Sequence, residues 1–216
     1  MTASLAERLR DETRNLHSEL ERGIFMHALL RGQLSRATYC MLLRNLQAIY
    51  AALELALVSH ATNPQVAPVF SPALFRSAAL HHDLDALHGP RWERALAIQP
   101  ASRLYVGRLQ QVHRTCPVLL VTHAYVRYLG DLSGGQLIKR KVSDSLQLAP
   151  GVGTAFYDFG DPDQTRSLTR AFRAGLDNIT CDEAQLALIV VEAQRAFELH
   201  RSLFQQLALA GGMTGP

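Results

Sequence analysis

The chain has 216 residues, of which 48% are hydrophobic and 19% are charged. This composition is typical of a globular protein with one large or two small domains, and it excludes intrinsic disorder. The 22 lysines and arginines stand against 19 acidic residues, and both signs are mixed along the chain, which argues against nucleic-acid binding. No apolar run approaches the roughly 20 residues of a membrane span, and the charged N-terminal segment does not resemble a signal peptide.

Three cysteines lie far apart in the sequence: Cys40, Cys116 and Cys181. An odd, dispersed set without a CxxC motif indicates neither a disulfide framework nor a zinc site. We therefore expect three free thiols in a reducing compartment, and a cytoplasmic protein.

Hydrophobic periodicity predicts helix in nearly every segment between the Gly- and Pro-containing turns. In chain order, helices are expected at about residues 4–22, 35–59, 72–87, 101–113, 117 to beyond 141, 163–176 and 180–208. Capping boxes at Ser4-x-x-Glu7 and Thr180-x-x-Glu183 predict where the first and last helices begin. Because strand alternation is nearly absent, we predict an all-α bundle of about seven to eight helices. It forms a single domain over residues 1–216, with a short flexible tail from about residue 209.

Four polar residues of the first helix share one flank beside its leucine stripe: Arg10, Arg14, His17 and Glu21. At 100° per residue they fall within about 60° of one another. Such a flank suits an anionic ligand that carries a metal: His17 would be the ligand, Glu21 would influence its second nitrogen, and the arginines would pair with carboxylates. The alternative is a solvated flank with ion pairs between residues four apart.

Three glycines fall within six residues of an otherwise helical segment: Gly130, Gly134 and Gly135. Each costs about 1 kcal/mol relative to alanine in a helix, so the trio costs roughly 2–3 kcal/mol. Glycine permits a kink and a close approach of the backbone to a flat ligand, and Arg127 and Asp131 share this face. The alternative is close helix packing through small residues, with Arg127 and Asp131 as an ion pair.

Other histidines are expected to be structural. His81, Asp85 and His88 have a spacing that suits a metal, but one helix alone rarely completes a site, so a surface role is favoured. His123 lies beside the glycines and is also expected to be structural. No paired Glu-x-x-His motifs occur, which excludes a ferritin-like di-iron bundle.

The run from Tyr128 to Gln136, YLGDLSGGQ, resembles the signature of the heme oxygenase family. The run from Leu9 to His17, LRDETRNLH, resembles the segment that carries the proximal heme ligand of that family. Further similarity occurs at about residues 44–54, 83–92 and 192–207, so that the resemblance spans about residues 5–207 and is weakest near 55–80.

The resemblance implies an all-α fold with heme sandwiched between a proximal N-terminal helix and a kinked, Gly-rich distal helix. It implies oxidative cleavage of heme to biliverdin, carbon monoxide and ferrous iron. Heme b would be both substrate and cofactor, consumed with O2 and electrons from an external donor such as a ferredoxin or flavodoxin with its reductase. The basic cluster Lys139-Arg140-Lys141 is a candidate docking point for an acidic donor.

Roles on the distal side follow from the resemblance. Asp131 matches the carboxylate that organises distal water, and Arg127 and Tyr50 match its supporting hydrogen-bond network. Gly130 and Gly134 match the glycines whose backbone lies over the heme. Gly135 would complete the flexible patch.

The proximal side is implied in the same way. His17 matches the axial ligand of the heme iron, and Glu21 a residue that interacts with it. Phe197 matches an aromatic of the pocket wall. Four residues match positions near the heme propionates: Arg10, Arg14, Tyr125 and Arg173.

Two features differ from the animal members of the family. Val126 stands where the animal members frequently have a hydroxyl residue, so the distal hydrogen-bond network would have one polar group fewer. The chain ends soon after the last predicted helix, so no membrane anchor is expected.

Because Arg10 and Tyr125 keep the hydrogen-bonding character that seats heme, we expect the α isomer of biliverdin. The alternative function is a non-catalytic heme carrier or sensor. Biliverdin supply to a photoreceptor, iron acquisition and heme detoxification remain open as purposes.

Overall fold

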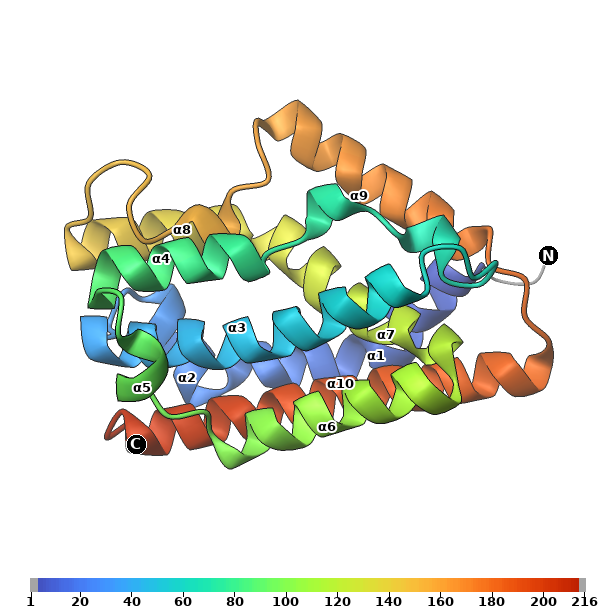
Figure 1. Cartoon of the computed structure of the whole chain (residues 1–216), viewed down its shortest axis with the longest axis horizontal. Coiled ribbons are helices and arrows are strands. Elements are labelled where there is room, and N and C mark those ends of the chain that lie inside the picture. The colour runs from blue at the N-terminus through green and yellow to red at the C-terminus, as the bar shows by residue number, and fades with distance from the viewer. Residues whose placement is uncertain (1–3, 214–216) are drawn as a thin grey trace.

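The computed structural model describes residues 4–213, and helices joined by turns and short loops account for almost all of them, with no strand in that range (Figure 1). This confirms the all-α prediction. The α-helices are α1 (Leu5–Arg22), α2 (Ile24–Leu30), α3 (Arg36–Ser59), α4 (Ser77–His88), α5 (Trp92–Ala95), α6 (Pro100–Thr115), α7 (Leu120–Ala124), α8 (Gly130–Leu146), α9 (Pro162–Asp177) and α10 (Glu183–Ala210).

Side-chain caps fix where four of these helices begin, namely α1, α3, α9 and α10. Ser4 and Glu7 form the expected capping box of α1. The predicted cap at Thr180 is wrong, because Asp182 is the N-cap of α10 and forms its box with Gln185. An aspartate is a stronger N-cap than a threonine, and the backbone oxygen of Thr180 accepts a hydrogen bond from Gln65 instead.

The other boundaries differ mainly where helices are short or irregular. α2 and α5 were not expected, and the region predicted as helix from residue 72 begins with a 3-10 turn at Pro72–Leu74 before α4. The predicted long helix from residue 117 is a 3-10 turn, then α7, a π-helix at Tyr125–Leu129, and α8. α10 continues through Ala210, one residue beyond the predicted start of the tail, and residues 214–216 lie outside the described range.

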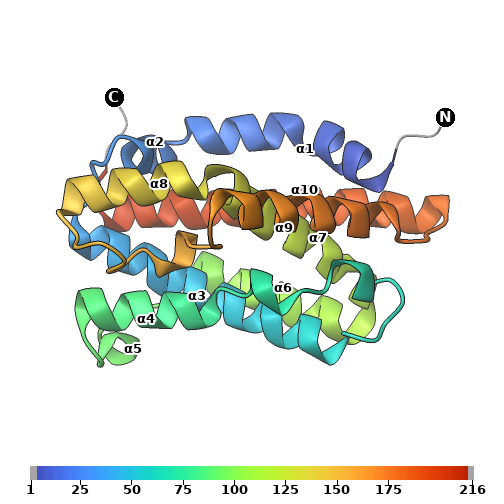
Figure 2. The same ribbon diagram turned by 90° about the horizontal axis from the view of Figure 1, so that it is seen from above.

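The helices form layers that place α1 opposite the α7–α8 segment (Figure 2). In this view α1 runs along one side, α3, α4 and α6 lie on the other, and α8 and α10 run between them. α10 packs against both α1 and α6, and α3 packs against α4 and α6. The long helix α10 therefore packs against α1 on one side and against α3 and α6 on the other.

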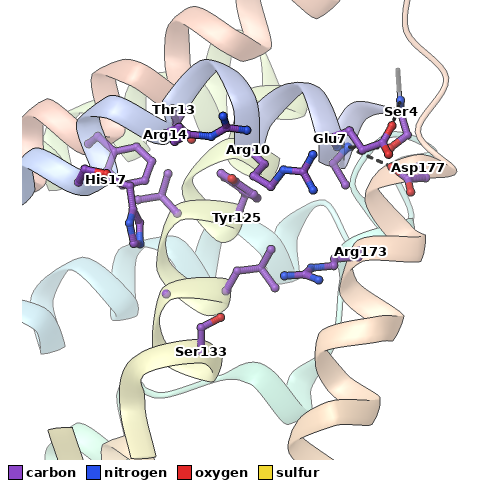
Figure 3. A pocket seen from close by; sticks show the side chains of 16 residues that line it. Ser4, Glu7, Arg10, Thr13, Arg14, His17, Tyr125, Ser133, Arg173 and Asp177 are labelled. Carbon is purple, nitrogen blue, oxygen red and sulfur yellow. Dashed lines mark hydrogen bonds between the residues drawn. The ribbon is translucent and has the colours of Figure 1, made fainter. Parts of the chain in front are cut away.

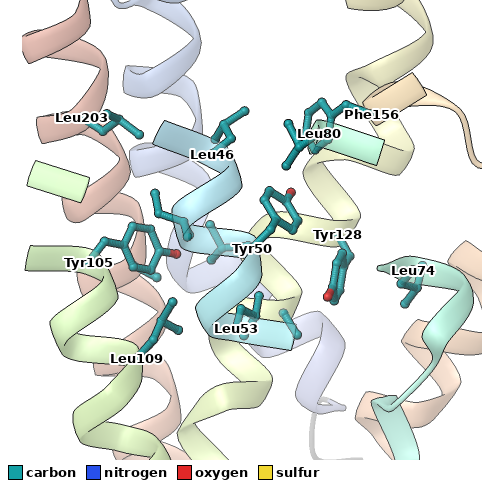
Figure 4. Packing of buried hydrophobic residues seen from close by; sticks show 14 of the residues in the cluster. Leu46, Tyr50, Leu53, Leu74, Leu80, Tyr105, Leu109, Tyr128, Phe156 and Leu203 are labelled. Carbon is teal, nitrogen blue, oxygen red and sulfur yellow. The ribbon is translucent and has the colours of Figure 1, made fainter. Parts of the chain in front are cut away.

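The core beneath α7 and α8 is aromatic (Figure 4). Tyr50 of α3 lies with its ring centroid 6.0 Å from that of Tyr128 and 5.4 Å from that of Phe156. Tyr105 of α6 is also fully buried. Burying each such side chain stabilises the fold by roughly 1.5–3 kcal/mol, so the π-helix rests on a rigid aromatic base.

α3 is the one helix of the described residues that is long and apolar enough to cross a membrane by composition. In the folded chain, 56% of the most apolar window of α3 is buried inside the protein. Its hydrophobicity is therefore explained as that of a central core helix, with α4 and α6 packed against it.

A buried ionic cluster joins α6, α7 and α10. Arg108 donates to both carboxylate oxygens of Glu192, and His123 lies 3.0 Å from the same carboxylate. Burial alone would raise the pKa of Glu192, but the hydrogen bonds from Arg108 and His123 outweigh that effect and lower the pKa to about 2. The expected structural role of His123 agrees with this position, which lies outside the cavities described below.

Glu192→Gln removes the charge while keeping the shape of the side chain. Because it leaves the Arg108 charge without its buried partner, we expect the free energy of unfolding to fall by about 3 kcal/mol. Glu198→Gln on the exposed face of the same helix is the matched control and should change it by less than about 0.5 kcal/mol. Urea unfolding at pH 7 measures both, and equal effects of the two substitutions would contradict a stabilising role of the cluster.

Candidate functional site

Two adjoining cavities lie between α1 and the segment formed by the π-helix and α8. The outer cavity has a volume of about 450 Å³ and the inner cavity about 310 Å³. Five residues line both: His17, Val126, Gly130, Ser133 and Phe197. The two cavities therefore meet along one shared wall.

The outer cavity is cationic. Arg10 of α1 and Arg173 of α9 extend toward the same space from opposite sides, with Tyr125 between them (Figure 3). Arg14 lines this cavity too, and Asp11 holds both α1 arginines, at 3.2 Å from Nε of Arg10 and 2.6 Å from Nη2 of Arg14. All four residues predicted near the propionates thus line one cavity.

The acidic residues at the outer rim are already engaged by backbone groups. Asp177 accepts a hydrogen bond from the backbone N–H of Ala6 at 3.0 Å, and Glu7 accepts one from the backbone N–H of Ser4 at 3.1 Å. Burial raises the pKa of Tyr125, although the nearby Arg173 and Arg10 oppose it. Tyr125 is therefore a neutral hydroxyl donor at pH 7, and the outer cavity suits an anion.

The inner cavity is mainly apolar. Its aliphatic and aromatic lining comes from α1, α2, α3, α8, α10 and the 3-10 turn at Ala155–Tyr157: Leu20, Met26, Leu29, Leu30, Leu42, Leu46, Leu137, Ile138, Phe156 and Phe204. Polar groups enter it at few points, chiefly Arg127, Asp131 and His200. A flat apolar molecule with acidic groups at one edge would match the two cavities together.

His17 is the imidazole at the junction of the cavities. Its side chain is half exposed, and its Nδ1 lies 3.7 Å from a carboxylate oxygen of Glu21. The ring stands edge-on to Phe197, with 6.0 Å between the ring centroids. Glu21 therefore faces one nitrogen and leaves the other for a ligand in the cavity.

The opposite wall is bare backbone. A Cβ added at Gly130 or Gly134 would meet no atom within 4 Å, and both glycines line the inner cavity. Gly135 differs, because it lines neither cavity and a Cβ there would touch Tyr157 at 3.4 Å. The expected part of Gly135 in the ligand-facing patch is thus replaced by packing against Tyr157.

The irregularity of this segment precedes the glycines. The five residues Tyr125–Leu129 form a π-helix, whereas Gly130, Gly134 and Gly135 lie in the regular helix α8. Figure 1 shows that the chain changes direction between α7 and α8. A π-bulge commonly kinks a helix and is frequent at functional sites, so the predicted kink exists but is produced by residues 125–129.

A buried hydrogen-bond network stands behind the inner cavity. The Tyr50 hydroxyl donates to Asp131, Nε of Arg127 donates to the Tyr50 oxygen at 3.1 Å, and Nη2 of Arg127 lies 3.5 Å from Asp131. Burial raises the pKa of Asp131, with Arg127 and Tyr50 opposing the shift. The three residues predicted to form the distal network are therefore in contact.

His200 was not predicted as a site residue. It lines the inner cavity, is 3% exposed, and contacts Nη1 of Arg127 through its Nδ1. The available signal was a histidine on the same helical face as Phe197 and Phe204, three residues after the first and four before the second. The other candidate histidines, His81 and His88, are exposed, and the described residues hold no cluster of metal-ligating side chains.

Comparison with known proteins identifies the family. The family model for heme oxygenase matches residues 3–206. The chain is 36% identical to heme oxygenase 1 of Synechocystis over 96% of its own length and 86% of that protein, and 37% identical to human heme oxygenase 1 over 96% and 73%. A crystal structure of Synechocystis heme oxygenase-2 in complex with heme and NO superposes with a TM-score of 0.93, at 37% identity, covering 97% of this chain and 87% of the other.

The helical fold and the two adjoining cavities define a protein that binds a flat ligand beside one imidazole. The body of that ligand is apolar and one edge carries anionic groups. The chain belongs to the heme oxygenase family. It is an enzyme that cleaves heme to biliverdin, with heme as substrate and cofactor. This sets aside the carrier or sensor alternative. The donor set fits heme: guanidinium groups for the propionates, an apolar slot for the ring, and a backbone wall without side chains.

Gly130→Ala and Gly134→Ala test whether the bare wall is kept for a ligand rather than for folding. Because the added methyl groups meet open space, each should raise the free energy of unfolding of the ligand-free protein by up to about 1 kcal/mol. Gly175→Ala is the control that should destabilise, since its Cβ would collide with the carbonyl oxygen of Pro68. Chemical denaturation measures all three. Destabilisation by Gly130→Ala and Gly134→Ala would show that these glycines serve packing.

Proposed function

We propose that His17 is the axial ligand of the heme iron and that the proximal side is built around it. Glu21, 3.7 Å from Nδ1, orients the ring and leaves Nε2 for the metal. Phe197 supports the ring edge-on. Imidazole is a common axial ligand of heme, and a carboxylate partner at the second nitrogen raises its basicity.

The outer cavity supplies the seat of the propionates in this proposal. Guanidinium groups form strong, bidentate hydrogen bonds with carboxylates, and Arg10 and Arg173 face this space from α1 and α9 (Figure 3). Arg14 neutralises Asp11 and so reduces its repulsion of a propionate. The hydroxyl of Tyr125 adds a neutral donor between the two helices.

Asp131 is proposed as the residue that delivers protons on the distal side. Tyr50 and Arg127 hold the carboxyl from behind, so its remaining lone pairs are directed to the inner cavity, where they orient water. The backbone at Gly130 and Gly134 permits the ring to approach α8 closely. Heme supplies the iron that activates dioxygen and the meso carbon that is opened, and the protein supplies ligation, orientation and protons.

The same seating favours opening at the α-meso carbon. Arg10 and Arg173 would hold the propionates and so would limit rotation of the ring in its plane, and the wall at Gly130 and Gly134 would limit which meso edge meets the distal network. Val126 lines both cavities and contributes only apolar contact there. The distal network consequently depends on Asp131, Arg127 and Tyr50.

Electrons come from an external donor, for which we propose an acidic ferredoxin or flavodoxin with its reductase. Within the basic cluster, Lys139 pairs with Asp158 at 2.9 Å, while Arg140 and Lys141 are exposed. A biliverdin-using photoreceptor is a proposed consumer of the product. We further propose that residues 1–216 form one domain and that the enzyme acts in the cytoplasm.

The observation that carries this function is the Tyr50–Arg127–Asp131 network beside a cavity with one imidazole. Hemin is added to the protein, and the spectrum is followed after a reductant is added in air with catalase. The wild-type heme spectrum should decay to that of biliverdin. Asp131→Asn should bind heme but turn it over about 10²-fold more slowly, whereas Asp144→Asn on the exposed side of α8 should match wild type. Persistence of the wild-type heme spectrum, or full activity of Asp131→Asn, would overturn the proposal.

Regiochemistry gives a separate prediction. Chromatography of the product should show mainly the α isomer of biliverdin. Arg10→Ala should add other isomers, because one propionate loses its guanidinium partner and the ring can rotate. Arg22→Ala, in the same helix but outside both cavities, should leave the isomer ratio unchanged. A wild-type product consisting mainly of β or δ biliverdin would refute the proposed seating.

A further inference from the structure

His200 occupies a position that connects α10 to the distal network. Its ring lies edge-on to Phe204, with centroids 4.3 Å apart, and only 3% of the residue is exposed. Nη1 of Arg127 contacts Nδ1 of the ring and lies 3.1 Å from Nε2. The imidazole is thus enclosed between an aromatic ring and a guanidinium.

The hydrogen-bond inventory of Arg127 determines the state of this ring. A guanidinium has five N–H donors and no acceptor. Its Nε donates to Tyr50 and its Nη2 faces Asp131, so its Nη1 requires an acceptor from His200. Only an unprotonated ring nitrogen can accept that bond, and Nδ1 is the nitrogen in closest contact.

We propose that His200 is a positioning residue for proton delivery: as a neutral imidazole it fixes the Arg127 guanidinium against Tyr50 and Asp131, and its protonation releases them. This inference rests on the proposed role of Asp131 and extends it to α10. Protonated His200 would have no lone pair for Arg127 and would place a second positive charge against the first. Arg127 would then move away, and Asp131 would keep the Tyr50 hydroxyl as a donor but lose the guanidinium.

The surrounding charges support a neutral ring. Arg127 on the π-helix is the charged group in direct contact with His200. Beyond it lie Tyr50 of α3, Asp131 of α8 and Tyr105 of α6, which act on Arg127, while His17 and Glu21 of α1 line the same cavity. Burial lowers the pKa of His200 well below its usual value, and Arg127 lowers it further.

The first test uses the ligand-free protein, so that it does not depend on heme turnover. Nitrogen NMR of His200 should show a neutral ring with unprotonated Nδ1 at pH 7. The Nε–H of Arg127 should exchange slowly with solvent in the wild type, at least tenfold faster in His200→Leu, and slowly again in His200→Asn, whose amide oxygen replaces Nδ1 as an acceptor. A charged His200 at pH 7, or unchanged exchange in His200→Leu, would overturn the positioning role whether or not the enzyme is active.

The second test separates protonation from simple packing. Because the pKa of His200 is lowered in the folded state, the unfolded chain binds the proton first as the pH falls below the ordinary histidine pKa of about 6.5. Stability should therefore be fully present above that pH. Relative to His200→Asn, the wild-type unfolding equilibrium constant should rise by about tenfold per pH unit below it. A ratio that stays constant from pH 8 to pH 5 would refute the coupling.

Turnover supplies the functional readout. In biliverdin formation at pH 8, His200→Leu should lose at least tenfold in rate while retaining its heme spectrum, and His200→Asn should recover most of that loss. At acidic pH the wild type should lose rate along a limb that His200→Asn lacks. His88→Asn, an exposed histidine on α4, is the control and should keep the wild-type profile. The same acid limb in His200→Asn would contradict the proposal.

Discussion

The buried charge of Arg127 is the constraint on which the distal side of this protein depends. Burying a guanidinium away from water costs free energy unless its N–H groups find acceptors. Here the acceptors come from three different helices: Tyr50 from α3, Asp131 from α8 and His200 from α10. The relative positions of those helices are therefore coupled to the geometry of the carboxyl group at the cavity, and a shift of any one of them is felt at Asp131.

The π-helix explains how one short segment serves both cavities. Each residue in a regular helix advances by 100°, and a π-helical turn holds one residue more than an α-helical turn, so the faces before and after it are out of register. Tyr125 consequently lines the outer cavity while Arg127 lines the inner one, and Val126 reaches both. The glycines that follow in α8 then need only provide a smooth wall, which regular helix does well.

Features within one regular helix were predictable from the sequence, and features that depend on packing between helices were not. The flank of Arg10, Arg14 and His17 and the cap at Ser4 follow from local spacing, and both are present. The packing of Gly135 on Tyr157, the N-cap at Asp182 and the contact of His200 with Arg127 each depend on how separate segments meet. Periodicity also assumed regular helix through residues 125–129, which placed the kink at the glycines rather than before them.

The two cavities also divide the molecule by its sensitivity to protons. The outer cavity is lined by arginines, whose charge persists throughout the physiological pH range. The inner cavity contains Asp131 and His200, whose pKa values burial shifts in opposite directions, up for the carboxyl and down for the imidazole. Burial thus disfavours charge on both groups, and for the carboxyl the charge of Arg127 and the hydrogen bond from Tyr50 oppose that effect. With the roles proposed above, the anionic edge of the substrate and the delivery of protons are handled by different groups in one continuous site.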